Sequence, residues 1–260
     1  MKVYLVSRMC DLRANIGRFL RDEEHSSKWV GCTLAGDLLP ELGGRLCYLS
    51  YDAPRPGGNA SYIQHIKEVG HGSVLEHSVF GVIITGVSRS LTHELVRHRA
   101  GMSYSQLSQR YVVRAERVEP PLISEIRVWA ESTESAEWLD TLTSWDALDE
   151  EVHGSYVART EKLAEWLEAH RPDLKGTEAK KAARQTARAC LQNQTETKIM
   201  VTANARAWRH FIEQRGSEHA DTEIRQLAVK ILGTLRPRAP NLFGDYVVTN
   251  GVISTPYPKV

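Results

Sequence analysis

The amino-acid sequence predicts an α/β fold with a buried sheet and a helix-rich second half, in a chain of 260 residues. Residues 79–87 form an almost continuous apolar run with several β-branched side chains, which indicates a strand buried on both faces. Apolar residues recur at helical spacing from Ala220 to Leu235, which indicates an amphipathic helix. Because there is no internal repeat and no low-complexity linker, we expect a single domain comprising residues 1–260.

Local signals place further elements in the first half of the chain. Residues 2–7 are expected to form the first strand. A short helix is expected after the buried strand, because Ser88 or Ser90 can serve as its N-cap and apolar residues follow at helical spacing. Arg97 and His98 close this helix, so the polar run after it begins at a helix end.

In the second half, residues 116–149 are polar and acidic, with Pro120-Pro121 marking a turn, and we expect a surface insertion. Helices are expected from residue 150 onward, because apolar side chains keep helical spacing there. Ser217 is expected to cap the last long helix, with Asp221 and Glu223 in its first turns.

Charge and cysteine content narrow the class of protein. Lys plus Arg is 33 and Asp plus Glu is 32, so no global basic field gathers nucleic acid, and any anion site must be local. The four cysteines form no Cys-x-x-Cys pair and are too few for a disulfide framework. No apolar stretch approaches the length of a membrane span. We therefore expect a cytoplasmic protein.

The densest chemistry lies in residues 97–111, which contain three arginines, one histidine and three serines. Arginine forks bind phosphate and lie flat on π systems, while serine hydroxyls and the Gln106 amide can bond the edges of a ring. The run therefore predicts a site for a phosphorylated, planar ligand. Because no glycine-rich phosphate loop follows the first strand, side chains would have to hold a dinucleotide.

The expected helix at residues 204–215 admits two interpretations. Arg215 falls on the apolar arc of this helix, so it either forms an internal salt bridge or points its guanidinium into a pocket. Arg206 and His210 share the opposite side, where they either clamp a second ligand or face solvent.

Two other patterns have ordinary explanations. Lys181, Arg184 and Arg188 form a basic stripe on one helix face, and such stripes are usually solvated. His93 begins a zincin-like pattern, but Arg97 occupies the position of the second ligand, so we expect no metal site.

The run at residues 97–111 resembles the signature of the flavin-dependent thymidylate synthases, in which Arg-His-Arg is followed at a fixed distance by a serine and then by an arginine. Further blocks resemble the same family in the same order, at residues 70–77, 88–94, 204–206 and 218–219. The resemblance covers roughly residues 43–113 and 178–235.

The resemblance implies an α+β fold with a central, mostly antiparallel sheet flanked by helices. It implies a homotetramer that binds FAD and dUMP where subunits meet. It also implies that methylenetetrahydrofolate donates a methylene group, which flavin hydride supplied by NADPH reduces, so that dUMP becomes dTMP. The expected partners are therefore small molecules and further copies of the chain, not nucleic acid or membrane.

The resemblance also implies roles for individual residues by matching position. The flavin contacts would be Ser73, Arg97, His98, Arg99, Gln106, Asn204, Arg206 and His210. The nucleotide contacts would be Glu94, Arg97, Gln106, Ser108, Gln109, Arg110, Arg188 and Arg215. Arg110 and Arg188 are the phosphate candidates, and Arg215 would be the catalytic cation that polarises the uracil.

Two departures from the family pattern leave the acceptor nucleotide open. Residues 100–107 hold one residue more than is usual, within Ala100-Gly101-Met102, and Gln192 replaces a proline after Leu191. A dedicated UMP C5-methylase of nucleoside-antibiotic pathways is therefore the close alternative, since a pocket not built against a hydroxyl rejects it weakly. Two further alternatives are a nucleic-acid-binding protein, with Tyr104 and Tyr111 stacking on bases, and a generic flavoprotein reductase.

Overall fold

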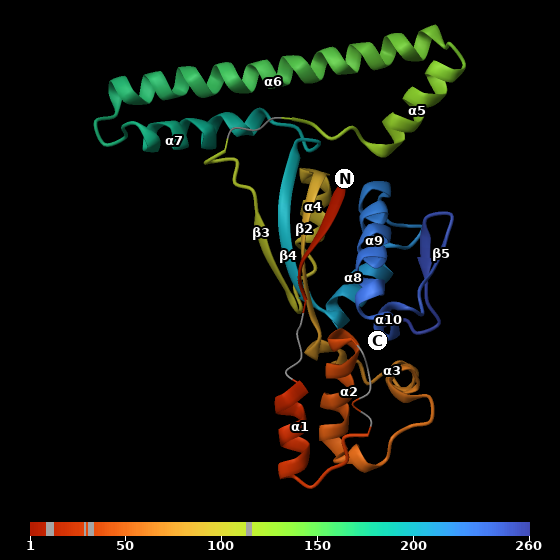
Figure 1. The fold of residues 1–260 in the computed structure, drawn as a ribbon. Coiled ribbons are helices and arrows are strands. Elements are labelled where there is room, and N and C mark those ends of the chain that lie inside the picture. The colour runs from red at the N-terminus through yellow and green to blue at the C-terminus, as the bar shows by residue number, and fades with distance from the viewer. Residues whose placement is uncertain (9–12, 29, 31–33, 113–115) are drawn as a thin grey trace. The chain divides into compact units, whose positions relative to one another are not determined.

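The computed structural model describes residues 1–8, 13–28, 30, 34–112 and 116–260 (Figure 1). Its main sheet has the strand order β1-β2-β4-β3. The four strands are β1 (Lys2–Arg8), β2 (Val79–Ser88), β3 (Met102–Gln106) and β4 (Glu196–Asn204). A separate antiparallel hairpin consists of β5 (Val247–Thr249) and β6 (Val252–Ser254). The expected α+β fold, with a mostly antiparallel sheet and flanking helices, is confirmed.

Helices make up most of the remaining described chain (Figure 1). The α-helices are α1 (Arg13–Asp22), α2 (Ala35–Tyr48), α3 (Gly58–Glu68), α4 (Arg89–Leu95), α5 (Pro121–Ser132), α6 (Ala136–His170), α7 (Thr177–Ala187), α8 (Ala205–Arg215), α9 (Thr222–Leu235) and α10 (Pro240–Phe243). Single 3-10 turns occupy Ser50–Asp52, Gly72–His77, Arg188–Cys190 and Arg236–Arg238. Within the described ranges, no helix combines the length and the apolar character that crossing a membrane requires.

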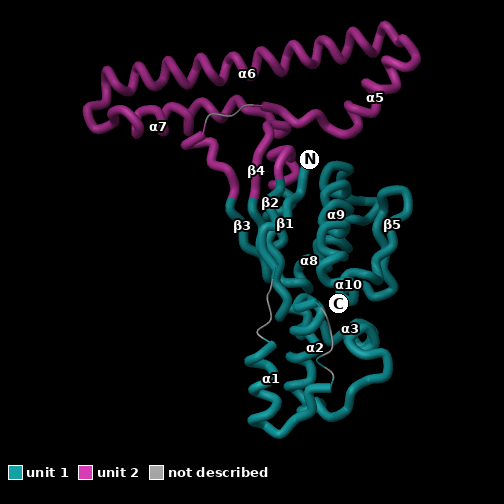
Figure 2. The backbone as a smooth tube through the Cα atoms, viewed as in Figure 1, with its two compact units in different colours: residues 1–84, 94–105, 200–260 teal, residues 85–93, 106–199 magenta. Residues whose placement is uncertain are grey.

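The described chain forms two compact units (Figure 2). Unit 1 comprises Met1–Ile84, Glu94–Ser105 and Met200–Val260, and unit 2 comprises Thr85–His93 and Gln106–Ile199. The chain passes from one unit to the other four times, so neither unit is a continuous segment.

The apolar core of unit 1 is built on α8 and α9, which contact each other, and α9 also contacts β1. Trp208, Phe211 and Ile212 are fully buried, as the helical spacing predicts. The indole of Trp208 donates to the carbonyl of Phe80 in β2, at 3.2 Å. The apolar stripe of α9 is buried too, so α8 packs against both β2 and α9.

Unit 1 also buries a cluster of charges beside α8. Arg209 donates to both carboxylate oxygens of Asp245, at 2.8 and 2.9 Å, and Lys67 donates to one of them at 2.7 Å. These three side chains are at most 6% exposed. Burial alone would raise the pKa of Asp245, but the hydrogen bonds and charges of Arg209 and Lys67 bring it to about 2. Asp245 is therefore ionised whenever the protein is folded near neutral pH.

Residues 116–149 of unit 2, expected as a surface insertion, are largely helical, so the helices begin well before residue 150. Pro120 and Pro121 begin α5, where a missing N–H costs nothing, and α6 already starts at Ala136. Only Leu142 and Tyr156 are buried in α6, so it has no clear apolar stripe. Ion pairs among Arg117, Glu119, Arg127, Asp146 and Asp149 tie this region together instead.

The expected cap of α9 is also wrong. Asp221, not Ser217, is the N-cap, because its carboxylate accepts a hydrogen bond from the N–H of Glu223 at 2.9 Å. The Ser217 hydroxyl instead donates to the carbonyl of Gln214 at the end of α8. Cys10 and Cys32 lie outside the described residues, whereas Cys47 and Cys190 are free thiols.

Candidate active site

The first part of the site is the segment that follows α4. The Ser88 hydroxyl accepts from the N–H of Leu91 at 3.0 Å and so caps this helix. In β3, the Tyr104 hydroxyl lies within hydrogen-bonding distance of the carbonyl oxygens of Leu95 and His98. Burial raises the pKa of Tyr104 to about 12, which keeps the hydroxyl protonated as a donor. The backbone at His98 is therefore anchored.

Residues 99–102 of this segment form a tight turn that requires glycine. The N–H of Met102 donates to the carbonyl of Arg99 at 3.2 Å, and Gly101 has a φ of 70°. The carbonyl of Gly101 accepts from the N–H of Asn204 at 3.2 Å. A Cβ added at Gly101 would lie 2.5 Å from Nδ2 of Asn204 and 3.2 Å from Cβ of Ala207. The turn thus packs directly against the start of α8.

Helix α8 provides the second part of the site. The side chain of Asn204 accepts from the N–H of Ala207 at 2.8 Å and so caps the helix. Arg206 and His210 are exposed on one side of it, and Arg215 is its last residue. The buried apolar face described above fixes which way these three side chains point.

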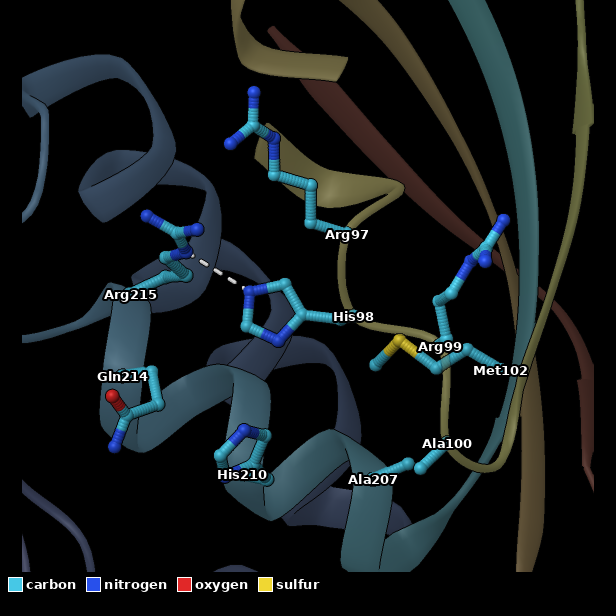
Figure 3. A pocket seen from close by; sticks show the side chains of 9 residues that line it. All are labelled: Arg97, His98, Arg99, Ala100, Met102, Ala207, His210, Gln214 and Arg215. Carbon is cyan, nitrogen blue, oxygen red and sulfur yellow. Dashed lines mark hydrogen bonds between the residues drawn. The ribbon is translucent and has the colours of Figure 1, made fainter. Parts of the chain in front are cut away.

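The side chains of Arg215, Glu94 and His98 meet at the wall of a pocket, and Figure 3 shows the contact between Arg215 and His98. Arg215 donates from Nη1 to Oε2 of Glu94 at 2.6 Å and from Nε to Nε2 of His98 at 2.9 Å. The Arg215 and Glu94 side chains are 25% and 33% exposed. The two interpretations of Arg215 therefore hold together, because the cation forms a salt bridge and also lines the pocket. The cavity measures about 410 Å³ and is lined by Arg97, His98, Arg99, Ala100, Met102, Ala207, His210, Gln214 and Arg215.

His98 is neutral in this arrangement. Burial, the charge of Arg215 and the nearby His210 together lower its pKa to about 4. Because a guanidinium nitrogen can only donate, Nε2 of His98 must accept, which places the imidazole proton on Nδ1. Glu94 is then the charged acceptor for Arg215, and His98 is a neutral one.

Two further hollows in unit 1 continue this surface. One of about 520 Å³ shares Ala100, Ala207, His210 and Gln214 with the first pocket, and is also lined by Asn204, Arg206 and Lys259. Another of about 310 Å³ is lined by Ser73 and Arg206 among others. Arg206 forms an exposed ion pair with Glu76 at 2.8 Å.

The donors around these hollows fit a planar ligand that carries phosphate. The guanidiniums of Arg97, Arg99 and Arg206 supply positive charge and flat faces. The amides of Asn204 and Gln214 supply groups for ring edges. Each of the three cavities also has a volume within or near the range of roughly 300 to 1,000 Å³ that is usual for ligand pockets.

The remaining residues expected at the site lie in unit 2. The amide nitrogen of Gln106 donates to the hydroxyls of Thr92 and Thr197, at 3.0 and 3.3 Å, which leaves its oxygen as an acceptor. The Ser108 hydroxyl accepts from the N–H of Arg110 at 3.3 Å, and Gln109 is half-buried beside it. The nucleotide set is thus divided, with Glu94, Arg97 and Arg215 in unit 1 and the others in unit 2.

Unit 2 gathers a basic cluster, which we define as Arg89, Arg110, Lys181, Arg184 and Arg188. Arg184 donates to the carbonyl of Tyr111 at 2.9 Å, and Arg110 and Lys181 lie 5.8 and 5.3 Å from the centre of its ring. Burial and the charge of Arg188 lower the pKa of Arg89. Among the described residues, Nε of Arg110 and Nε of Arg184 are buried without a hydrogen-bond partner, as are Nε of Arg209 and Nε of Arg236 outside the cluster. Such unsatisfied donors favour an anion at this place.

Comparisons with known proteins agree with this chemistry. The family model described as "Thymidylate synthase complementing protein" matches residues 33–241. A flavin-dependent thymidylate synthase of Mycolicibacterium vanbaalenii is 48% identical over 225 residues, which cover 85% of this chain and 83% of that protein. The enzyme of the same name from Mycobacterium tuberculosis is 46% identical over 224 residues, covering 85% and 84%. The chain belongs to the flavin-dependent thymidylate synthase family.

Membership of the flavin-dependent thymidylate synthase family confirms the resemblance seen in the sequence. It gives no support to the nucleic-acid-binding and generic reductase alternatives. Arg89 is absent from the site residues that the sequence predicts, and the sequence places Lys181 and Arg184 in a stripe that is expected to be solvated. The available signal was the position of Arg89, a cation directly after the helix cap Ser88.

We expect the substitution Gly101→Ala to weaken flavin binding, because the new Cβ would push the turn away from Asn204 and α8. Gly58→Ala is a matched control, since Gly58 also has a positive φ, 63°, but nothing lies within 4 Å of its added Cβ. Backbone strain is thereby common to both variants, and only Gly101→Ala adds the clash. Flavin titration measures the difference, and equal affinities of the two variants would contradict it.

The lowered pKa of His98 predicts a pH dependence of stability. As pH falls from about 6.5 to about 4, the unfolded chain binds a proton on His98 that the folded chain does not, so the free energy of unfolding decreases. Asp37 acts in the opposite sense, because burial raises its pKa from 3.8 to about 6. The contribution of His98 is therefore measured as the difference between the wild type and His98→Gln in urea titrations at several pH values. A difference that stays constant across this window would refute the prediction.

Proposed function

We propose that this protein methylates C5 of dUMP in a flavin-dependent reaction that yields dTMP. The observation that carries the proposal is the Arg215 guanidinium, which Glu94 and His98 hold at the wall of a cationic pocket. A guanidinium beside the uracil stabilises the negative charge that develops as C5 becomes nucleophilic. The relatives of 46% and 48% identity carry the name of this activity, which supports the same assignment.

FAD is the cofactor, and it supplies the hydride that reduces the one-carbon unit donated by methylenetetrahydrofolate, with NADPH as reductant. The hollows in unit 1 are the proposed flavin site. Arg97, Arg99 and Arg206 would neutralise its phosphates, while Asn204 and His210 would bond the edges of the ring system. Ser73 would contribute from the neighbouring hollow of unit 1, and Gln106 would offer its amide oxygen to the flavin as the resemblance implies.

The basic cluster of unit 2 is the proposed site of the nucleotide phosphate. Its two unsatisfied Nε donors, on Arg110 and Arg184, support this assignment, and charge-assisted hydrogen bonds of this kind contribute about 1.5 to 3 kcal/mol each. Arg188 would bind the same phosphate. We further propose that Ser108 and Gln109 bond the nucleotide rather than take part in nucleophilic catalysis.

The decisive test is an anaerobic half-reaction. The protein is purified, its visible spectrum is recorded, and the reduced flavin is mixed with methylenetetrahydrofolate and either dUMP or UMP. Reoxidation of the flavin together with formation of dTMP is expected. Protein that stays colourless after incubation with FAD would refute the proposal.

The same assay determines which nucleotide, dUMP or UMP, is the methyl acceptor. The names of the relatives support dUMP, and they give no support to a dedicated UMP methylase. A rate on dUMP more than about a thousandfold above that on UMP would mean that the pocket discriminates actively against the 2′-hydroxyl. Comparable rates would mean that the pocket leaves room for it.

We also propose that the chain acts as a single domain in a cytoplasmic homotetramer. The interleaving of the two units along the chain supports one domain. Association is supported by large apolar side chains of unit 2 that are 42–67% exposed, namely Leu122, Val128, Trp129, Trp145, Leu148 and Trp166. Light scattering during gel filtration should give a mass of four chains, and a monomer mass at micromolar concentration would contradict this.

A further inference from the structure

We propose that His98 is a positioning residue for Arg215, fixing the plane of its guanidinium through the hydrogen bond between Nε and the imidazole Nε2. This role deepens the proposed function and rests on it. Family resemblance implies only a flavin contact for His98. The structure adds that its ring is engaged by Arg215 at 2.9 Å.

The Arg215 guanidinium has more donors than protein acceptors. An arginine side chain has five N–H groups, one on Nε and two on each terminal nitrogen. Nε points to His98, and one N–H of Nη1 points to Glu94. The two N–H groups of Nη2 and the second one of Nη1 then remain for a ligand. Nε and Nη1 do not share an edge of the guanidinium, so protein holds it at two different sides, and Nη2 is left to face the uracil.

Two anchors are needed because one is insufficient to set a plane. The contact between Glu94 and Nη1 alone would let the guanidinium turn about that hydrogen bond. A second contact at Nε removes this freedom, because both acceptors must lie in the plane of the fork. A neutral imidazole suits this purpose, since it orients the cation without neutralising it a second time.

The imidazole ring of His98 is itself held by its neighbours, so it can fix the orientation of the Arg215 guanidinium. Its ring packs edge-to-face against Phe211, with centroids 5.4 Å apart, and lies 5.7 Å from the ring of His210. Phe211 lies one turn before Arg215 on α8, so the helix supplies both the support for the ring and the side chain that it orients. The backbone carbonyl of His98 is anchored separately by Tyr104.

Two substitutions separate positioning from flavin contact. His98→Phe keeps a flat ring against Phe211 but removes the acceptor, whereas His98→Gln keeps an acceptor on a side chain of similar reach. We expect His98→Phe to lower kcat by about tenfold to a hundredfold, since a misplaced catalytic group has effects of this size, with flavin content unchanged. We expect His98→Gln to recover most of kcat. His170→Gln, on the exposed end of α6, is the control for a generic histidine replacement.

The other outcomes overturn the proposal in distinguishable ways. Equal loss of flavin in both variants would make His98 a cofactor contact only. Unchanged kcat in His98→Phe would remove the positioning role. If the wild type forms no dTMP, the proposed function itself fails, and the kinetic comparison has no basis.

A direct measurement does not depend on activity. In wild-type protein with 15N-labelled histidine, nuclear magnetic resonance should find His98 neutral, with its proton on Nδ1, and Arg215→Gln should shift its Nε2 resonance. A proton on Nε2 would overturn the proposal, because that nitrogen could not then accept from Arg215.

Discussion

Replacing Arg215 with glutamine is expected to lower kcat for dUMP methylation by about a hundredfold to a thousandfold, the usual effect of removing a preorganised group that stabilises developing negative charge. Glutamine retains a donor but carries no charge and cannot engage Glu94 and His98 at the same time. Flavin content should change little, because Arg97, Arg99 and Arg206 remain. The measurements are steady-state kinetics and the visible spectrum of the purified variant.

Arg215→Lys is the informative companion to this variant. Lysine keeps the positive charge but lacks the planar fork and the Nε donor, so it should recover part of the activity and not all of it. Arg225→Gln is the control, because Arg225 donates to the carbonyl of Glu218 on an exposed part of the surface. If Arg215→Gln kept more than about a tenth of the wild-type kcat, charge stabilisation by Arg215 would be excluded as the main contribution.

Replacing Asp245 with asparagine is expected to produce the largest loss of stability. The substitution leaves the charges of Arg209 and Lys67 buried without a counter-charge, and breaking a buried ion pair in this way costs about 3 to 5 kcal/mol. In a protein of this size the thermal midpoint should fall by roughly 10 °C. Thermal unfolding followed by circular dichroism measures the change.

Asp173→Asn provides the matched comparison for Asp245→Asn. Its carboxylate also accepts two hydrogen bonds from an arginine, Arg171, but the two side chains are 57% and 50% exposed. Solvent screens that pair, so the midpoint of Asp173→Asn should equal that of the wild type. Similar midpoints for Asp245→Asn and Asp173→Asn would show that burial does not set the strength of the Asp245 cluster.

The sequence predicted those parts of the fold that depend on one regular pattern. The apolar run of β2 is recognisable because burial on both faces favours continuous apolar sequence, and the stripes of α8 and α9 because burial on one face imposes a fixed spacing. Helix α6 was missed in its first turns because it buries only two of its side chains. Charge pairs such as Arg127 with Asp146 stabilise that region, and these pairs join residues at separations that have no helical period.

The candidate site was predictable to a similar extent. Charge on an apolar arc marked Arg215 as a special residue, and the structure places it as expected at the end of α8. Its two partners could not be identified from spacing, because Glu94 and His98 lie more than a hundred residues away in the chain. Which acceptor a buried cation finds is a property of tertiary packing. Resemblance to a family supplied the residue types there, but not the hydrogen bond between two of them.

The four passages of the chain between the two units have a consequence for biosynthesis. Strand β1 packs against α9, so residues 2–8 require a partner that is translated more than two hundred residues later. Unit 1 cannot be completed until the whole of unit 2 has been translated. At usual rates of about 5 to 20 residues per second, β1 waits for roughly ten seconds or longer before α9 is available to it. Chaperone demand during expression should therefore fall on that segment, and a nascent chain halted before α9 should be more sensitive to protease there than the released protein.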